Sequence, residues 1–312
     1  MGLSLRQDES VAAVADSVQR YCASLPAGIA FRELWRGLAD LGLFSLPELF
    51  AESACAATVA GMEALGRRGI GGPVADTLTF AACAPADLLE PVIAGATVAC
   101  LGRLPLVPFP DMPAIHVTNA DGKAVLLDIA SAEPVDMLAG EAWARVTGST
   151  GRDLGPFATW ADRYDIAISG WLVGAGLELT EAASAHAAQR VQFGKTIGEF
   201  QAVAAPLARA IMALDSSKVL VETAAANLDA GDACLVTAAR WSAARAAEQA
   251  AITAHQTYGA FGVLEAGPVF GRSRRIRQIA SQFPQERPVD AQAALGSGSL
   301  GILDRNCAEA VR

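Results

Sequence analysis

The sequence predicts a mainly α-helical protein that carries a small β-strand module between two helical parts. Apolar residues recur every three or four positions from about Glu9 to Leu89 and again from about Phe157 onward, as expected of helices with one buried face. Between Gly95 and Gly148 this period gives way to short β-rich stretches separated by prolines. With 312 residues, 52% of them hydrophobic, the chain can bury a large core. The expected domains are an N-terminal helical domain at 1–92, a reduced β-strand module at 93–152 and a C-terminal helical bundle at 153–312.

The N-terminal helices are predicted from apolar stripes and from the breaks between them. The stripes are Leu34, Leu38 and Leu41, followed by Val59, Met62 and Leu65. Breaks are expected at Pro26, at Pro47 and in the glycine-rich run Gly69–Pro73.

The β module is predicted from three short segments, TVACLGRL, AIHVTN and KAVLLDI, which are rich in β-branched and aliphatic residues. The sequence Asn119–Gly122 between the last two is typical of a tight turn. We expect a compact strand-rich unit that is short for a domain.

Three long helices are predicted in the C-terminal part. The first covers Ile168 to Val191 and ends near Gly194. The second opens near Pro206, where a first-turn proline is tolerated, and runs to about Leu228. The third runs from about Cys234 to Thr257, and short turns between the three favour an antiparallel four-helix bundle.

Composition excludes several classes of function. A net charge of −9 and a pI near 4.9 oppose binding to a phosphate backbone, so no nucleic-acid partner is expected. The six cysteines are scattered without a CxxC pair, which predicts reduced thiols and no metal site. No uninterrupted apolar run reaches the roughly 18 residues of a membrane span, and the N-terminus lacks the apolar core of a signal peptide. We expect a cytoplasmic protein.

Two motifs carry a resemblance to a known family. The segment Arg190–Gln201, RVQFGKTIGEFQ, resembles the RxxFGxxIxxFQ motif of the acyl-CoA dehydrogenases and lies between two long C-terminal helices, as it does there. Farther on, His255–Gly262, HQTYGAFG, is similar to the family's QxxGGxG turn, with Ala260 in place of the second glycine. The resemblance is strongest over about Tyr164 to Arg277.

The resemblance implies an acyl-CoA dehydrogenase-like fold and contacts to FAD across a subunit interface. A guanidinium such as Arg190 and the N–H groups of a glycine turn suit a pyrophosphate, and the Phe193 ring offers a flat apolar surface. The glutamine amides suit adenosine or ribose. The implied FAD contacts are Arg190, Gln192, Phe193, Ile197, Gln201, Gln256, Gly259 and Ala260.

Two features of typical family members are missing. The β module lacks the Thr-Glu-Pro-Gly-x-Gly-Ser-like loop and the Trp-Ile-Thr-like strand that cradle the isoalloxazine. The glutamate that removes the α-proton of the thioester is also absent: its usual position falls at Phe283–Gln285, and the alternative position on the first long helix falls on Tyr164. No confident catalytic residue is identified.

Three carboxylates are candidates for a role in catalysis or substrate binding. Glu265 and Glu286 are possible stand-ins for the base, although Glu265 is better explained as a cap or as an ion-pair partner of the arginine run Arg272–Arg277. Asp162 is a candidate contact for the CoA portion of a substrate, because an aspartate at that offset has this role in some relatives.

The favoured hypothesis is a subunit of a flavin-dependent acyl-CoA dehydrogenase that is active only as a hetero-oligomer. The resemblance is to the short subunits of actinobacterial heterotetramers of steroid and sterol breakdown. It implies an α2β2 assembly with a longer chain that supplies the base, an acyl-CoA substrate such as a steroid-derived one, and an electron-transfer flavoprotein or similar acceptor. The alternatives are a self-sufficient homo-oligomeric dehydrogenase with a relocated base, and a flavin-free scaffold or lyase of the same fold.

Overall fold

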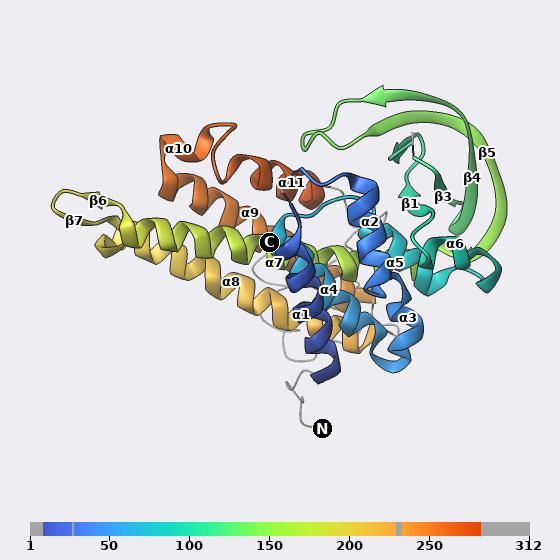
Figure 1. Ribbon diagram of the computed structural model, residues 1–312, viewed down its shortest axis with the longest axis horizontal. Coiled ribbons are helices and arrows are strands. Elements are labelled where there is room, and N and C mark those ends of the chain that lie inside the picture. Colours follow the sequence, from blue (N-terminus) through green and yellow to red (C-terminus); the bar gives the residue numbers. More distant parts are fainter. Residues whose placement is uncertain (1–8, 27, 111, 229–232, 282–312) are drawn as a thin grey trace, which may run out of the picture.

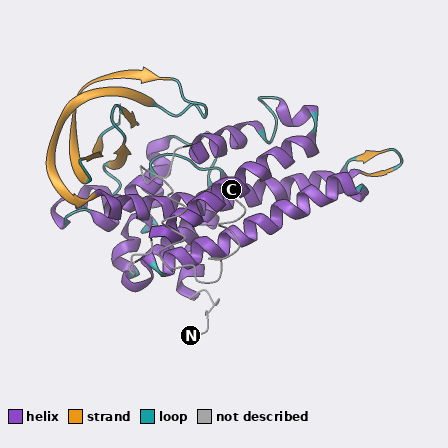
Figure 2. Cartoon of the chain, turned by 180° about the vertical axis from the view of Figure 1, so that it is seen from behind, coloured by secondary structure: helices purple, strands orange, loops and turns teal. Residues whose placement is uncertain are grey.

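The structure, a computed structural model, describes residues 9–26, 28–110, 112–228 and 233–281. A five-stranded sheet lies at one end of the molecule, long helices run through its length, and a small hairpin projects from the opposite end (Figures 1 and 2). Within the described residues, no single helix is long and apolar enough to cross a membrane. One bent pair of helical segments, Leu43–Leu49 and Ala51–Arg68, reaches the required length and composition when the two are combined.

Helices form the N-terminal part, as expected. They are α1 (Glu9–Ser24), α2 (Phe31–Asp40), α3 (Leu46–Leu49), α4 (Ala54–Arg68), α5 (Val74–Cys83) and α6 (Glu90–Ile93), with 3-10 turns at Leu43–Ser45, Ala51–Ser53 and Ala86–Leu88. The second predicted stripe is buried throughout. In the first stripe Leu38 is buried but Leu41 is 41% exposed, because Leu41 is the C-cap residue of α2 and the helix has already ended there.

The strands form one mixed sheet with the order β1-β3-β4-β5-β2. They are β1 (Val98–Gly102), β2 (Leu106–Pro108), β3 (Ala114–Ala120), β4 (Lys123–Val135) and β5 (Trp143–Pro156). β1 and β3 are parallel, and the other pairs are antiparallel. The expected turn is confirmed: Asp121 and Gly122 both have positive φ, as a two-residue hairpin turn requires.

β4 and β5 are much longer than the sequence indicates. The predicted segment KAVLLDI covers only the first half of β4, which continues to Val135 and pairs with β5 over its whole length. The outer half of β4, from Ala130 to Pro134, is solvent-exposed on both faces, so it shows no alternation of buried and exposed positions. The ribbon arches over the helices in Figure 1.

The C-terminal helices are α7 (Phe157–Gln189), α8 (Gln201–Ala226), α9 (Ala233–Tyr258), α10 (Ala260–Val263) and α11 (Phe270–Ser281), with a 3-10 turn at Ile197–Glu199. The third predicted helix is confirmed to within one residue at each end. The prediction for α7 was wrong at its start, because the helix begins directly after β5. Its first turns bury Phe157 and Trp160, and the Trp160 ring lies 5.8 Å edge-on from Phe80 of α5.

α8 also starts earlier than predicted, at Gln201 rather than near Pro206. The carbonyl of Phe200 accepts hydrogen bonds from the N–H groups of Val203 and Ala204, which fixes the first turn before the proline is reached. Pro206 therefore lies inside the helix, at the cost of one backbone hydrogen bond.

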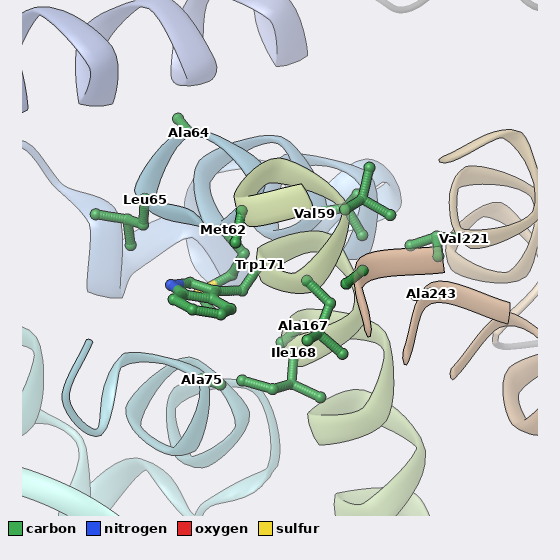
Figure 3. Packing of buried hydrophobic residues seen from close by; sticks show 14 of the residues in the cluster. Val59, Met62, Ala64, Leu65, Ala75, Ala167, Ile168, Trp171, Val221 and Ala243 are labelled. Carbon is green, nitrogen blue, oxygen red and sulfur yellow. The ribbon is translucent and has the colours of Figure 1, made fainter. Parts of the chain in front are cut away.

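The main core lies where α4 and α9 pack against α7 (Figure 3). Met62 and Leu65 of α4 face Trp171 and Ile168 of α7. The backbones of α4 and α7 approach so closely that a Cβ atom at Gly174 would overlap the carbonyl oxygen of Glu63. The N-terminal helices and the bundle therefore share one continuous core.

Candidate functional site

The segment between α7 and α8 is a short hairpin at the far end of the bundle. β6 (Val191–Gln192) and β7 (Lys195–Thr196) are joined by Phe193 and Gly194, whose φ values of 52° and 81° are those of a two-residue turn. A left-handed conformation costs a residue with a side chain roughly 1–2 kcal/mol, so a glycine or asparagine would suit the first turn position better than phenylalanine.

Phe193 is 92% exposed at the tip of this hairpin. Its ring has one aromatic neighbour among the described residues, Phe200, which lies edge-on at 6.2 Å. An aromatic ring held in water on a strained backbone is costly in the isolated chain, and residues of this kind are found at binding sites more often than elsewhere.

Local contacts hold the hairpin in place. Thr196 and Glu199 form a reciprocal capping box, with the Glu199 carboxylate accepting a 3.0 Å hydrogen bond from the Thr196 N–H. The Ile197 N–H donates to the carbonyl oxygen of Arg190 at 2.8 Å. The Lys195 ammonium lies 4.4 Å from the centroid of the Phe200 ring. The hairpin is therefore a defined element that keeps Arg190 and Phe193 at fixed places.

The glycine turn follows the end of α9. Gly259 has φ 60° and ψ −137°, a conformation open almost only to glycine, and its N–H donates to the His255 carbonyl. Gly262 is buried against the same helix end. The turn therefore leaves the exposed backbone of Gly259 and Ala260 at the surface.

The two motifs come to the same end of the bundle. The ring of Tyr258 stacks on His186 of α7 at 4.3 Å, and its hydroxyl donates to the carbonyl of Ala182 at 3.1 Å. These contacts place the glycine turn against the last turns of α7, directly before Arg190. Figure 1 shows α10 and the β6–β7 hairpin at the same end of the bundle.

Most of the eight predicted FAD-contact residues are solvent-exposed. Ile197 alone is half-buried; the exposed ones are Arg190, Gln192, Phe193, Gln201, Gln256, Gly259 and Ala260. Gln192 uses its amide for a 2.7 Å hydrogen bond to the Val191 carbonyl. The exposed set presents a cation, amides, backbone N–H groups and an aromatic ring toward solvent from one end of the molecule.

The predicted catalytic and substrate residues lie elsewhere. Glu265 is exposed in the loop between α10 and α11, and the expectation that it pairs with the arginine run is not borne out in the described part of the chain: Arg272 pairs with Glu178, and Arg275 with Glu141. Asp162 is half-buried near the start of α7, roughly 40 Å along that helix from Arg190. Glu286 and the segment Phe283–Gln285 lie outside the described residues.

A small central cavity lies where the three parts of the chain meet. Asp76 of α5, Glu141 and Trp143 from the sheet side, Tyr164 of α7 and Ile279 of α11 line it. Its volume of about 50 Å³ has room for only a few water molecules. A flavin ring or an acyl thioester is much larger, and ligand sites usually measure about 300–1,000 Å³.

Asp76 is the ionisable group that sequence reasoning missed at this cavity. Burial raises the pKa of its carboxyl to about 7, against a partial opposing effect of the 2.9 Å hydrogen bond that Oδ1 accepts from the Leu101 N–H. Burial also raises the pKa of Tyr164. The available signal was an aspartate inside the apolar run of α5, which is unusual unless the side chain has a buried partner.

Comparisons with known proteins identify the fold. Residues 164–283 match the family model of the acyl-CoA dehydrogenase C-terminal domain. No curated protein matches the sequence. Among solved structures, the chain resembles a variant of the steroid ACAD Tcur3481–Tcur3483 at a TM-score of 0.73 and 19% identity, covering 87% of this chain and 92% of that chain.

Two further solved structures have the same fold. The ChsE4–ChsE5 complex from Mycobacterium tuberculosis matches at a TM-score of 0.68 and 18% identity, covering 87% of this chain and 90% of that one. A glutaryl-CoA dehydrogenase from Mycobacterium smegmatis in complex with FADH2 matches at a TM-score of 0.72 and 12% identity, covering 88% of this chain and 91% of that chain. The expected fold class, helical with a small β module and acyl-CoA dehydrogenase-like, is confirmed.

Proposed function

We propose that this chain, which has the fold of the acyl-CoA dehydrogenases, is a subunit of a flavin-dependent acyl-CoA dehydrogenase and contributes FAD contacts to a partner chain. The partner supplies the catalytic base and the pocket for the isoalloxazine. The proposal rests on the contrast between the two candidate sites: the motif residues are exposed at one end, and the central cavity is too small for a flavin.

The exposed end fits the nucleotide part of FAD. The Arg190 guanidinium and the backbone N–H of the exposed Ala260, which follows Gly259, offer positive charge and a hydrogen-bond donor to a pyrophosphate. Phe193 offers a flat ring for an adenine to stack on, at low entropic cost because the hairpin is already ordered. Exposed binding groups of this kind need a second surface to enclose the ligand, and a partner chain provides it.

The central cavity supports the other half of the proposal. About 50 Å³ between α5, α7, α11 and the sheet leaves no room for a tricyclic ring beside Tyr164. When bound, FAD supplies the hydride acceptor of an α,β-dehydrogenation. In the complex, Arg190 and Phe193 bind and orient the nucleotide, while proton removal from the substrate is assigned to a glutamate of the partner.

The similar solved structures support a hetero-oligomer. Two of them are described as pairs of different chains, Tcur3481–Tcur3483 and ChsE4–ChsE5, and the first is called a steroid ACAD. By that analogy we assign this chain to an α2β2 heterotetramer acting on a steroid-derived acyl-CoA, with an electron-transfer flavoprotein as the acceptor.

The test is expression of the chain alone and together with a longer acyl-CoA dehydrogenase encoded beside it. We expect the lone chain to be colourless and the complex to be yellow, with one flavin shared per pair of unlike subunits. Visible absorbance and native mass spectrometry of each purified species measure both. Stoichiometric flavin in the lone chain, reduced on addition of acyl-CoA, would refute the proposal and would make Glu265 the residue to replace.

A further inference from the structure

A groove lies between α9 and α11 and is lined by residues of both helices. Its volume is about 370 Å³, which is within the range of sites for small organic ligands. Its apolar lining includes Leu138 from the β4–β5 loop, Ile252 of α9 and Val263 of α10, and all three side chains are also exposed at its mouth. Phe270 and Ile276 of α11 complete the apolar surface.

Two guanidinium groups stand at this groove. Arg274 and Arg277 of α11 line it, and among the residues that the structure describes neither forms an ion pair, in contrast to Arg272 and Arg275. Arg274 lies over the Phe270 ring at 5.2 Å. Glu248 of α9 is the acidic residue in the groove lining, so the two arginines leave the groove with an excess of positive charge. The chain as a whole carries a net charge of −9.

A histidine of the lining links α9 to α11. His255 lines the groove and bonds through Nε2 to the Ser273 hydroxyl at 2.8 Å, while its Nδ1 is buried without a hydrogen-bond partner in the described part of the chain.

We propose that the groove between α9 and α11 binds a small anionic amphiphile: an apolar body between Leu138, Ile252 and Phe270, and a carboxylate or phosphate head on Arg274 and Arg277. Charge complementarity selects an anion, and the aliphatic and aromatic lining selects an apolar body over a bare ion. The groove adjoins the glycine turn through His255 and Val263, but its two cations lie on α11, outside the predicted FAD contacts.

Titration calorimetry of the full chain with octyl phosphate tests the site. Octanoate distinguishes a carboxylate from a phosphate head, while inorganic phosphate and octanol test the head and the body separately. We expect octyl phosphate or octanoate to bind at one site per chain, at least about tenfold more tightly than phosphate or octanol, since a charged hydrogen bond contributes about 1.5–3 kcal/mol.

Substitutions then locate the ligand. Arg274→Gln and Arg277→Gln should each weaken binding by about tenfold, and Ile252→Glu should abolish it by placing a negative charge at the mouth. Arg209→Gln, at an exposed arginine of α8, is the matched control and should leave binding unchanged. Circular dichroism melting confirms that each variant is folded.

Three results would overturn the proposal. Octanol binding as tightly as octyl phosphate would reduce the groove to a non-specific apolar surface. Unchanged binding in both arginine variants would place the anion elsewhere. A dimer in light scattering that dissociates on Ile252→Glu, with no binding of either octyl anion, would assign the groove to a second copy of the chain.

Discussion

At the scale of single residues, the buried side chain of Asp76, which is 7% exposed, links α5 to the sheet. Its carboxylate accepts from the Leu101 N–H, and the adjacent Thr77 hydroxyl bonds to both the N–H and the carbonyl of Ala99. These bonds fix β1 against α5 at the edge of the central cavity. Since burial raises the Asp76 pKa from 3.8 to about 7, the folded protein holds this proton more tightly than the unfolded chain.

This shift predicts a pH dependence of stability. A raised carboxyl pKa stabilises the fold fully below the unfolded value of 3.8, and this contribution is lost as pH rises through about 7. Asp76→Asn keeps an oxygen for the Leu101 N–H and cannot ionise, so the variant should be more stable than the parent at pH 8, by up to about 4 kcal/mol. Urea unfolding at pH 5 and pH 8 measures the difference.

Asp153→Asn is the control for this experiment. The Asp153 carboxylate is exposed and paired with Lys123 at 2.6 Å, so its loss should change the free energy of unfolding little at either pH. A stability difference between Asp76→Asn and the parent that does not change with pH would contradict the assigned ionisation.

Phe193 should matter for cofactor retention and not for folding. Because its side chain is 92% exposed and its φ is positive, Phe193→Gly removes strain and should raise stability or leave it unchanged. The same change should lower the flavin content of the co-expressed complex, as measured by visible absorbance per mole of complex. Leu49→Gly, at another exposed apolar side chain, should leave flavin content unaltered. Full flavin occupancy with Phe193→Gly would remove the proposed stacking role.

At the scale of elements, the crossing of α4 and α7 depends on glycine. Gly174→Ala would drive a Cβ atom into the Glu63 carbonyl, and backbone cannot give way as a side-chain tip can. We expect a loss of about 1–3 kcal/mol or more in the free energy of unfolding, measured by thermal or urea denaturation.

Gly271→Ala provides the comparison within another helix. A Cβ atom at Gly271, in the first turn of α11, meets no atom within 4 Å, and alanine has the higher helix propensity. This variant should be as stable as the parent or more so. Equal stability of both alanine variants would show that α4 and α7 can separate without cost.

Elements with strong periodicity were predictable from the sequence, and those defined by distant contacts were not. The stripe Val59, Met62, Leu65 and the helix α9 follow from local pattern alone. The start of α7 depends on Trp160 packing against Phe80, a contact between residues far apart in the sequence. The outer half of β4 is held by backbone hydrogen bonds to β5, which leave no trace in its own side-chain pattern.

The residues of the candidate site could be predicted from the sequence, but their exposure to solvent could not. The motif at Arg190 and the glycine turn at Gly259 could be read from the sequence because turn chemistry is local. That their side chains face solvent, and that the central cavity holds no more than about 50 Å³, depends on the packing of all three parts of the chain.

For the whole molecule, the hairpin offers a direct measure of assembly. Arg190 and Lys195 are exposed on either side of the Phe193 turn, and both are residues after which trypsin cleaves. Limited trypsin digestion of the lone chain should cut first in this hairpin, because exposed loop tips are the preferred sites of nicking. Binding to the partner should protect it. Gel analysis of the tryptic fragments from the lone chain and from the complex measures this protection. Lys195→Gln is the control, because it removes one of the two cleavage sites in the hairpin.

The same hairpin has a consequence for how a cell would keep its two chains in balance. In the proposed assembly, a copy bound to its partner would hide the segment around Phe193, whereas a surplus copy would expose it to proteases. Turnover would then remove orphan subunits and spare assembled ones, so the ratio of the two polypeptides would be set after translation, by survival and not by synthesis.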